Sequence, residues 1–177
     1  MSRSFITECL VLKSKDYKEA DKILTLFTKS DGKVNAIAKG VRKQTSRKAG
    51  SLDAFTYSKV SLVLWKDIYI ITQAEVIDSY DSLKRKLGKQ SKLYLVGETL
   101  DNLLPFNEEQ SDLFQKVVVN LEKTTSEDLL IIILYDLGYW SEKFPRDLDS
   151  IKRYIESLMD NKLNSYKLME RIEHLGV

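Results

Sequence analysis

A run of cations stands between two apolar parts of the chain. Its letters are KGVRKQTSRKAGS, residues 39–51, and they hold two glycines, no acidic residue and the cations Lys39, Arg42, Lys43, Arg47 and Lys48. Cations without counter-charges repel one another, so this basic loop is expected to be mobile and to protrude. Lysine and arginine neutralise phosphates and release condensed counterions, whatever the base sequence. The basic loop therefore predicts contact with a nucleic-acid backbone.

Further lysines lie in the neighbouring predicted strands and turns. They would extend the cationic surface of the loop, and the three of main interest are Lys13, Lys15 and Lys33. The alternative is that these side chains only form a solvated face that keeps the protein in solution.

Aromatic residues provide a second possible contact with nucleic acid. In the alternation of one predicted strand, Phe55, Tyr57 and Trp65 fall on the same side, and Tyr69 would join them across a hairpin. Bases stack on exposed aromatic rings, so Trp65 and Tyr69 are the candidate stacking residues. The alternative is that these rings pack in a core or an interface.

The sequence offers little for catalysis or metal binding. It has one cysteine, Cys9, and one histidine, His174, which cannot form a cluster of soft metal ligands. It has no glycine-rich phosphate loop, zinc-protease motif or nucleophile elbow. We therefore expect no catalytic residue, no cofactor and no bound metal, with Cys9 as a buried strand residue.

The elements that must position these residues change character near residue 78. Before it, five apolar segments have strand character, at 5–13, 23–28, 34–39, 55–64 and 68–77. Asp31-Gly32 between the second and third gives a hairpin signal. Five short strands suit a small barrel such as the OB fold. After it, helical stripes surround residues 93–103, 113–121, 129–137, 148–158 and 168–175. We predict an α+β protein with a five-stranded OB-type barrel at 1–78 and an all-helical domain at 79–177.

Charge is distributed unevenly between these parts. Residues 1–50 carry 12 Lys+Arg against 5 Asp+Glu, a net of +7, although the whole chain has a formal net charge of only +2. This asymmetry favours a polyanion as partner for the first part and a protein-facing role for the rest. The sequence shows no apolar run long enough to span a bilayer and no signal-peptide pattern, so we expect a cytoplasmic protein without a membrane partner.

One stretch of the chain resembles a known family. The segment CLVLKSKDYKEADKILTLFTKSDGKVNAIAKGVRK, residues 9–43, is similar to the start of RecO proteins, and so are SRKAGSLDAFTYSKVSLV and ITQAEVIDSY. In the helical part, ILYDLGYW and KLNSYKLM are similar to family segments. Many RecO proteins carry a four-cysteine zinc module after the Leu-Gly-Tyr helix, but Tyr139 here leads to Phe144-Pro145 without a cysteine. The resemblance therefore indicates a short form without zinc.

The resemblance implies a non-enzymatic mediator of DNA repair and recombination, associated with the nucleoid. Such a protein binds single- and double-stranded DNA, anneals complementary strands and cooperates with RecR to load RecA onto DNA covered by the single-strand-binding protein. The acidic C-terminal tail of that protein is a further implied partner. The implied phosphate contacts are Lys39, Arg42, Lys43, Arg47 and Lys48, with Lys13, Lys15 and Lys33 as additional candidates. From the residues alone, an OB-type RNA-binding protein and a protein-interaction adaptor remain open.

Overall fold

The structure is a computed structural model that describes residues 4–44, 46, 48–159 and 162–164. The chain divides into two compact units. The first combines Met1–Tyr80 with Pro105–Val118, and the second combines Asp81–Leu104 with Val119–Val177. Each unit is described by itself below.

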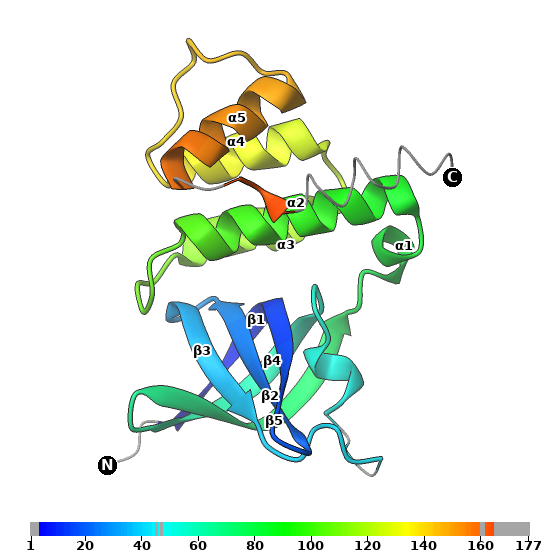
Figure 1. Ribbon diagram of the computed structural model, residues 1–177. Coiled ribbons are helices and arrows are strands. Elements are labelled where there is room, and N and C mark those ends of the chain that lie inside the picture. The colour runs from blue at the N-terminus through cyan, green and yellow to red at the C-terminus, as the bar shows by residue number, and fades with distance from the viewer. Residues whose placement is uncertain (1–3, 45, 47, 160–161, 165–177) are drawn as a thin grey trace. The chain divides into compact units, whose positions relative to one another are not determined.

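The first unit is built on a closed barrel of five strands (Figure 1). The strands are β1 (Ser4–Tyr17), β2 (Asp21–Thr28), β3 (Gly32–Ala38), β4 (Tyr57–Trp65) and β5 (Ile68–Asp78). They close in the order β1-β2-β3-β5-β4, and only the β3–β5 pair is parallel. The predicted α+β class, with an N-terminal five-stranded OB barrel followed by helices, is confirmed.

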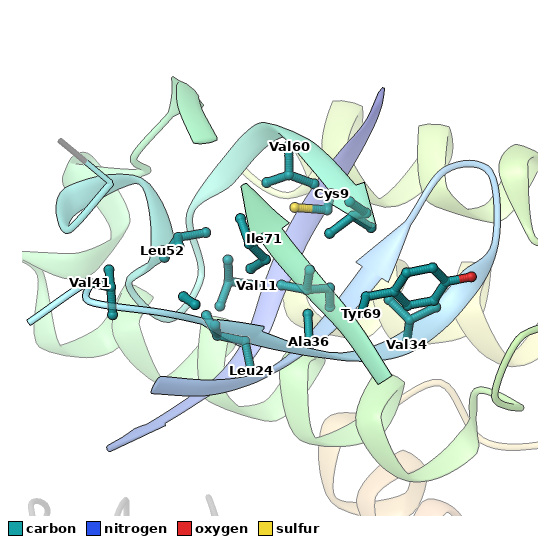
Figure 2. Packing of buried hydrophobic residues seen from close by; sticks show 13 residues of the cluster. Cys9, Val11, Leu24, Val34, Ala36, Val41, Leu52, Val60, Tyr69 and Ile71 are labelled. Carbon is teal, nitrogen blue, oxygen red and sulfur yellow. The ribbon is translucent and has the colours of Figure 1, made fainter. Parts of the chain in front are cut away.

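The barrel interior is filled by small and branched apolar side chains (Figure 2). Alternation along the strands directs Leu24 and Leu26 of β2 inward, together with Val34 and Ala36 of β3. Cys9 is fully buried in this core, as the sequence predicted. Its burial raises the pKa of the thiol to about 12, because a thiolate cannot be solvated there.

The β2–β3 hairpin uses a turn one residue longer than the two-residue turn that Asp31-Gly32 suggested. The register pairs Thr28 with Gly32, which leaves three residues in the loop. Gly32 has a φ of +62°, the left-handed conformation that closes three-residue hairpin loops. A Cβ atom at Gly32 would lie 1.8 Å from the carbonyl oxygen of Glu108. Glycine is therefore needed both for the turn and for this close approach.

A segment that follows the first helices returns to the barrel. Within the first unit, Phe114 of α3 (Ser111–Asn120) is fully buried, and its ring lies 5.3 Å from that of Phe27 and 6.0 Å from that of Tyr57. The backbone N–H of Asn107 donates to the carbonyl of Lys33 at 2.9 Å. The domain prediction had assigned this segment to the helical part, whereas the contacts group it with the barrel.

The second unit is helical. It contains α1 (Asp81–Lys84), α2 (Leu87–Leu103), α4 (Ser126–Asp136) and α5 (Leu148–Met159). The expected cap of α4 is present, since the hydroxyl of Thr125 accepts from the N–H of Asp128 at 3.1 Å. The helix ends close to Gly138, as expected, where φ is +79°. The helical stripe expected at 168–175 lies outside the described residues. No helix in the described ranges is long and apolar enough to cross a bilayer.

Candidate nucleic-acid interface

The outer face of β1, β2 and β3 carries exposed lysines. The registers place Lys13 opposite Thr25 and Lys15 opposite Ile23, and the partners of Thr25 and Ile23 on β3 are Asn35 and Ile37. Cross-strand partners point to the same side of a sheet, so these side chains form two rows across three strands. Lys13 and Lys15 are both exposed, whereas Ile23 and Ile37 are half-buried. Lysines therefore lie at one margin of this face, on β1, and polar and aliphatic side chains cover β2 and β3.

Trp65 lies at the end of β4 and presents the most exposed tryptophan ring that the structure describes. Its side chain is 53% exposed. The ammonium groups of Lys39 and Lys66 lie 5.7 Å and 5.0 Å from its ring centroid, within cation–π distance. The structure thus brings together Lys39 and Trp65, which the sequence had proposed separately. Lys66 was missed, although its place in the β4–β5 turn beside a tryptophan was a usable signal.

The β1–β2 turn repeats this arrangement. Lys18 follows the half-exposed Tyr17, and its ammonium lies 5.2 Å from the Tyr17 ring. Lys18 and Lys66 both adopt positive φ, 52° and 56°. In an OB barrel the β1–β2 and β4–β5 turns border the face of β2 and β3 that takes oligonucleotides. Each of these turns therefore carries an aromatic ring followed by a lysine.

The basic loop is fixed to the barrel at several points. Val41 is buried in the barrel core, and the N–H of Arg42 donates to the carbonyl of Ala20 at 3.0 Å. The Arg42 guanidinium lies 3.3 Å from the Asp16 carboxylate and donates to the carbonyl of Lys18 at 3.3 Å. The Arg42 and Asp16 side chains are 38% and 60% exposed, so this ion pair is accessible to water and weak. A phosphate could replace Asp16 as the partner of Arg42.

Lys48 has a different environment from the other loop cations. Its ammonium donates to the carbonyl oxygens of Ile71 at 3.2 Å and Lys39 at 3.4 Å. Partial burial lowers the pKa of Lys48, and the nearby carboxylate of Asp21 opposes this shift in part. Lys48 therefore fastens the loop to β5, while Lys43 remains exposed at the loop surface.

Lys33 does not lie at the proposed surface. It is only 5% exposed, and its ammonium lies 4.1 Å from the centroid of the Phe106 ring. It is covered because the chain from Pro105 onward packs over this end of the hairpin. We therefore remove Lys33 from the candidate contacts.

Tyr69 likewise corrects the expected aromatic group. It pairs with Leu64 in the β4–β5 hairpin, so it shares the face of Leu64, opposite to that of Trp65. It is 6% exposed and meets the ring of Phe5 edge-on at 5.6 Å inside the barrel. Phe55 is also buried, and the hydroxyl of Tyr57 donates to Glu8 at 2.5 Å. Trp65 thus remains as the stacking candidate of the original group.

Two further predictions, the phosphate contact of Arg47 and the absence of a metal site, involve residues that the structure does not describe. Arg47 lies outside the described residues. The described part of the chain contains no cluster of three or more His, Cys, Asp or Glu side chains that could hold a metal ion.

Comparisons with known proteins agree with this geometry. Residues 1–80 match the family model described as "Recombination protein O N terminal". Curated relatives named "DNA repair protein RecO" include one from Heliobacterium modesticaldum, 39% identical over 112 residues, which are 63% of this chain and 41% of the relative. That from Clostridium novyi is 46% identical over 79 residues, 45% of this chain and 31% of the relative. That from Oceanobacillus iheyensis is 30% identical over 135 residues, 75% of this chain and 52% of the relative.

The alignments to these three relatives thus span about half or less of the relatives' own length. Within that span, the matching strands build the barrel that carries the exposed lysines and Trp65. Residues 1–80 are therefore an N-terminal domain of the RecO family, and the chain as a whole is similar to RecO proteins.

Proposed function

We propose that this chain acts without catalysis in DNA repair and recombination, by binding DNA on the outer face of its barrel. The observation that carries the proposal is the grouping of exposed Lys13 and Lys15 on β1 with the Lys39–Trp65–Lys66 cluster at the bordering turn. Family membership supplies the repair context, because the curated relatives are named DNA repair proteins.

The proposed contacts divide the work between phosphates and bases. Lys13, Lys15, Lys39 and Lys43 neutralise phosphates, and Arg42 joins them by exchanging Asp16 for a phosphate. A base stacks on the Trp65 ring, as bases do on exposed aromatics of OB barrels. Lys39 and Lys66 are already beside that ring, so the flanking phosphates of a stacked nucleotide meet cations there.

The finer parts of the proposal follow from the family. The chain binds single- and double-stranded DNA, anneals complementary strands and acts with RecR to load RecA onto DNA covered by the single-strand-binding protein. The acidic tail of that protein is a further proposed partner. A pull-down of RecR, RecA and the single-strand-binding protein, with and without DNA, tests these partners.

A salt titration of binding to labelled single-stranded DNA tests the phosphate contacts. Reversing Lys13, Lys15 and Lys39 to Glu should weaken binding and flatten the plot of log K against log salt by about 2, or about 0.7 per lost contact. A matched control reverses Lys89, Lys123 and Lys143, which are exposed residues of the helical unit. The control changes net charge equally, so an equal loss in both variants would refute a localised interface.

Trp65 is tested separately in a Trp140→Phe background, which leaves one tryptophan. Single-stranded DNA should quench Trp65 fluorescence, and Trp65→Ala should cost about 1–3 kcal/mol of binding free energy with an unchanged salt slope. Competition with RNA of the same sequence distinguishes a DNA-binding from an RNA-binding OB protein. Unquenched fluorescence at saturating DNA would exclude stacking on Trp65.

A further inference from the structure

The second half of β5 has a strand neighbour on one side. The registers pair β5 with β4 from Ile68 to Asp78, but they pair it with β3 only at Tyr69 and Ile70. Among the strands that the structure describes, no other one continues the ladder beside residues 72–78. Alternate backbone N–H and C=O groups of this free edge point away from β4, and such an edge can accept another strand.

Lys48 marks the point where the β3–β5 ladder stops. Its ammonium donates to the carbonyl of Ile71, the residue directly after the last β3–β5 pair. A side chain thus supplies the donor that a neighbouring strand would otherwise supply. Beyond Ile71, no described strand pairs with this edge of β5, and the short 3-10 helix at Gly50–Leu52 is the described element that packs near it.

A groove of about 930 Å³ lies beside this edge. It is lined by residues 72–75 of β5, by residues 59–61 of β4 and Ile6 of β1, and by Gly40, Ser46 and Lys48 of the basic loop. All of its lining residues belong to the barrel unit. The groove therefore gives an extended segment room beside β5.

Aliphatic side chains are exposed at the same place. Val76 and Ile77 are 42% and 47% exposed, and Ile6, which lines the groove, is 63% exposed. Consecutive residues of a strand point to opposite faces, so Val76 and Ile77 lie on opposite faces of β5, and the aliphatic face of an added strand can cover Val76. Exposed apolar side chains along a strand edge are typical of an interaction site.

The charges around the groove favour an acidic occupant. Lys48 and Lys59 line it, and the side chain of Lys43 extends beside Gly40 at the rim. Glu75 is the one acidic residue of the lining, and it lies opposite Lys59 in the register. The surroundings are therefore net cationic, while the edge itself requires backbone hydrogen-bonding groups.

We infer that the β5 edge binds an extended, acidic segment of a partner protein, which joins the sheet as a further strand beside residues 72–78. Its backbone pairs with the free edge, its aliphatic side chains cover Val76 on one face of the strand, and its carboxylates meet Lys43 and Lys59. A nucleic acid lacks the alternating N–H and C=O groups that the edge requires. A second copy of this chain would set Glu75 opposite Glu75 in a two-fold pairing centred on the free edge.

The test uses the full chain and a fluorescein-labelled ten-residue peptide of alternating valine and glutamate. Fluorescence anisotropy should show binding, and Val76→Asp should weaken it at least about tenfold, because the new carboxylate repels the peptide. The control is Val119→Asp on α3, since Val119 is also 42% exposed. Backbone amide hydrogen exchange of residues 72–78 should slow when the peptide binds, which separates strand addition from loose attraction.

Three results would overturn the inference. The first is no binding of the valine–glutamate peptide, or equal binding of an alternating valine–lysine peptide. The second is an affinity that Val76→Asp leaves equal to that of Val119→Asp. The third is displacement of the peptide by an oligonucleotide that itself protects residues 72–78, which would assign the groove to nucleic acid.

Discussion

Lys13, Lys33 and Lys48 have the same side chain but meet different surroundings on the barrel. Lys13 points outward from β1 and is exposed, Lys33 is covered by Phe106, and Lys48 donates to backbone carbonyls. Of the three, only Lys13 lies exposed on the outer face of the barrel. The number of cations in a segment therefore overestimates the number of available contacts, because backbone carbonyls and aromatic rings compete for them.

Cys9 provides a pH-dependent prediction. Its pKa is raised from 9.0 to about 12, so the folded thiol stays protonated while the unfolded thiol ionises above pH 9. The stability that this group contributes is complete below pH 9 and is lost as pH rises toward 12. At pH 10.5 the loss should be about 2 kcal/mol, from about 1.4 kcal/mol per pH unit.

Urea unfolding at pH 8 and pH 10.5 measures this loss. The Cys9→Ala variant is less stable at both pH values because of its cavity, but it should lose about 2 kcal/mol less than the parent chain between them. Equal losses in the two chains would show that the thiol does not titrate on unfolding. In the native state, Cys9 should also resist alkylation until urea unfolds the barrel.

Gly32 provides a stereochemical prediction. Gly32→Ala places a Cβ 1.8 Å from the Glu108 carbonyl oxygen at a φ of +62°, so the hairpin or the packed segment must shift. We expect a loss of about 3 kcal/mol or more in the free energy of unfolding, beyond the usual cost of left-handed alanine. The matched control is Gly50→Ala, since nothing lies within 4 Å of a Cβ there. Comparable urea midpoints for both variants would contradict the contact.

The strands and helices differ in how well the sequence predicted them. Apolar and β-branched segments indicated all five strands, and the cap at Thr125 and the stop near Gly138 indicated the bounds of α4. The strand β1 continues to Tyr17 through a polar stretch that offers no apolar alternation. The last residues of β1 pair with β2. This pairing depends on the neighbouring strand, so the local sequence does not reveal it. The burial of Tyr69 could not be predicted for a related reason. Only the register of the β4–β5 hairpin shows that Tyr69 lies on the same face as Leu64.

The helix α4 gives a prediction that depends on one hydroxyl. Thr125→Ala removes the acceptor for the Asp128 N–H and should cost about 1 kcal/mol in unfolding free energy. Thr125→Ser keeps the hydroxyl and should recover most of that loss. Hydrogen exchange of the first amides of α4 checks the cause, because those amides should exchange faster in the alanine variant alone. Equal exchange in both variants would assign the loss to something other than capping.

At the scale of the whole molecule, the two compact units are not continuous in the sequence. The segment Pro105–Val118 follows two helices of the second unit but belongs to the barrel unit. In the barrel strands, Phe27 and Tyr57 have Phe114 as an aromatic neighbour. Periodicity showed that residues 113–121 form a helix, but it carries no information on the partner of that helix. The family match at 1–80 accordingly covers the strands without the segment that packs on them.

Residues 1–80 alone should therefore fold poorly. The fragment loses the buried ring of Phe114 and the Asn107–Lys33 hydrogen bond, and it exposes Phe27, which is fully buried in the complete chain. Losing a buried phenylalanine alone costs about 3–5 kcal/mol, a large part of the 5–15 kcal/mol that typically holds a domain together. Urea unfolding should thus show a much lower midpoint than in the full chain, with stronger binding of a hydrophobic dye. Joining residues 105–120 to the fragment through a glycine–serine linker should restore the midpoint, whereas the same fusion carrying Phe114→Ala should not. A fragment 1–80 that unfolds at the midpoint of the fused chain would show that the barrel needs no such cover.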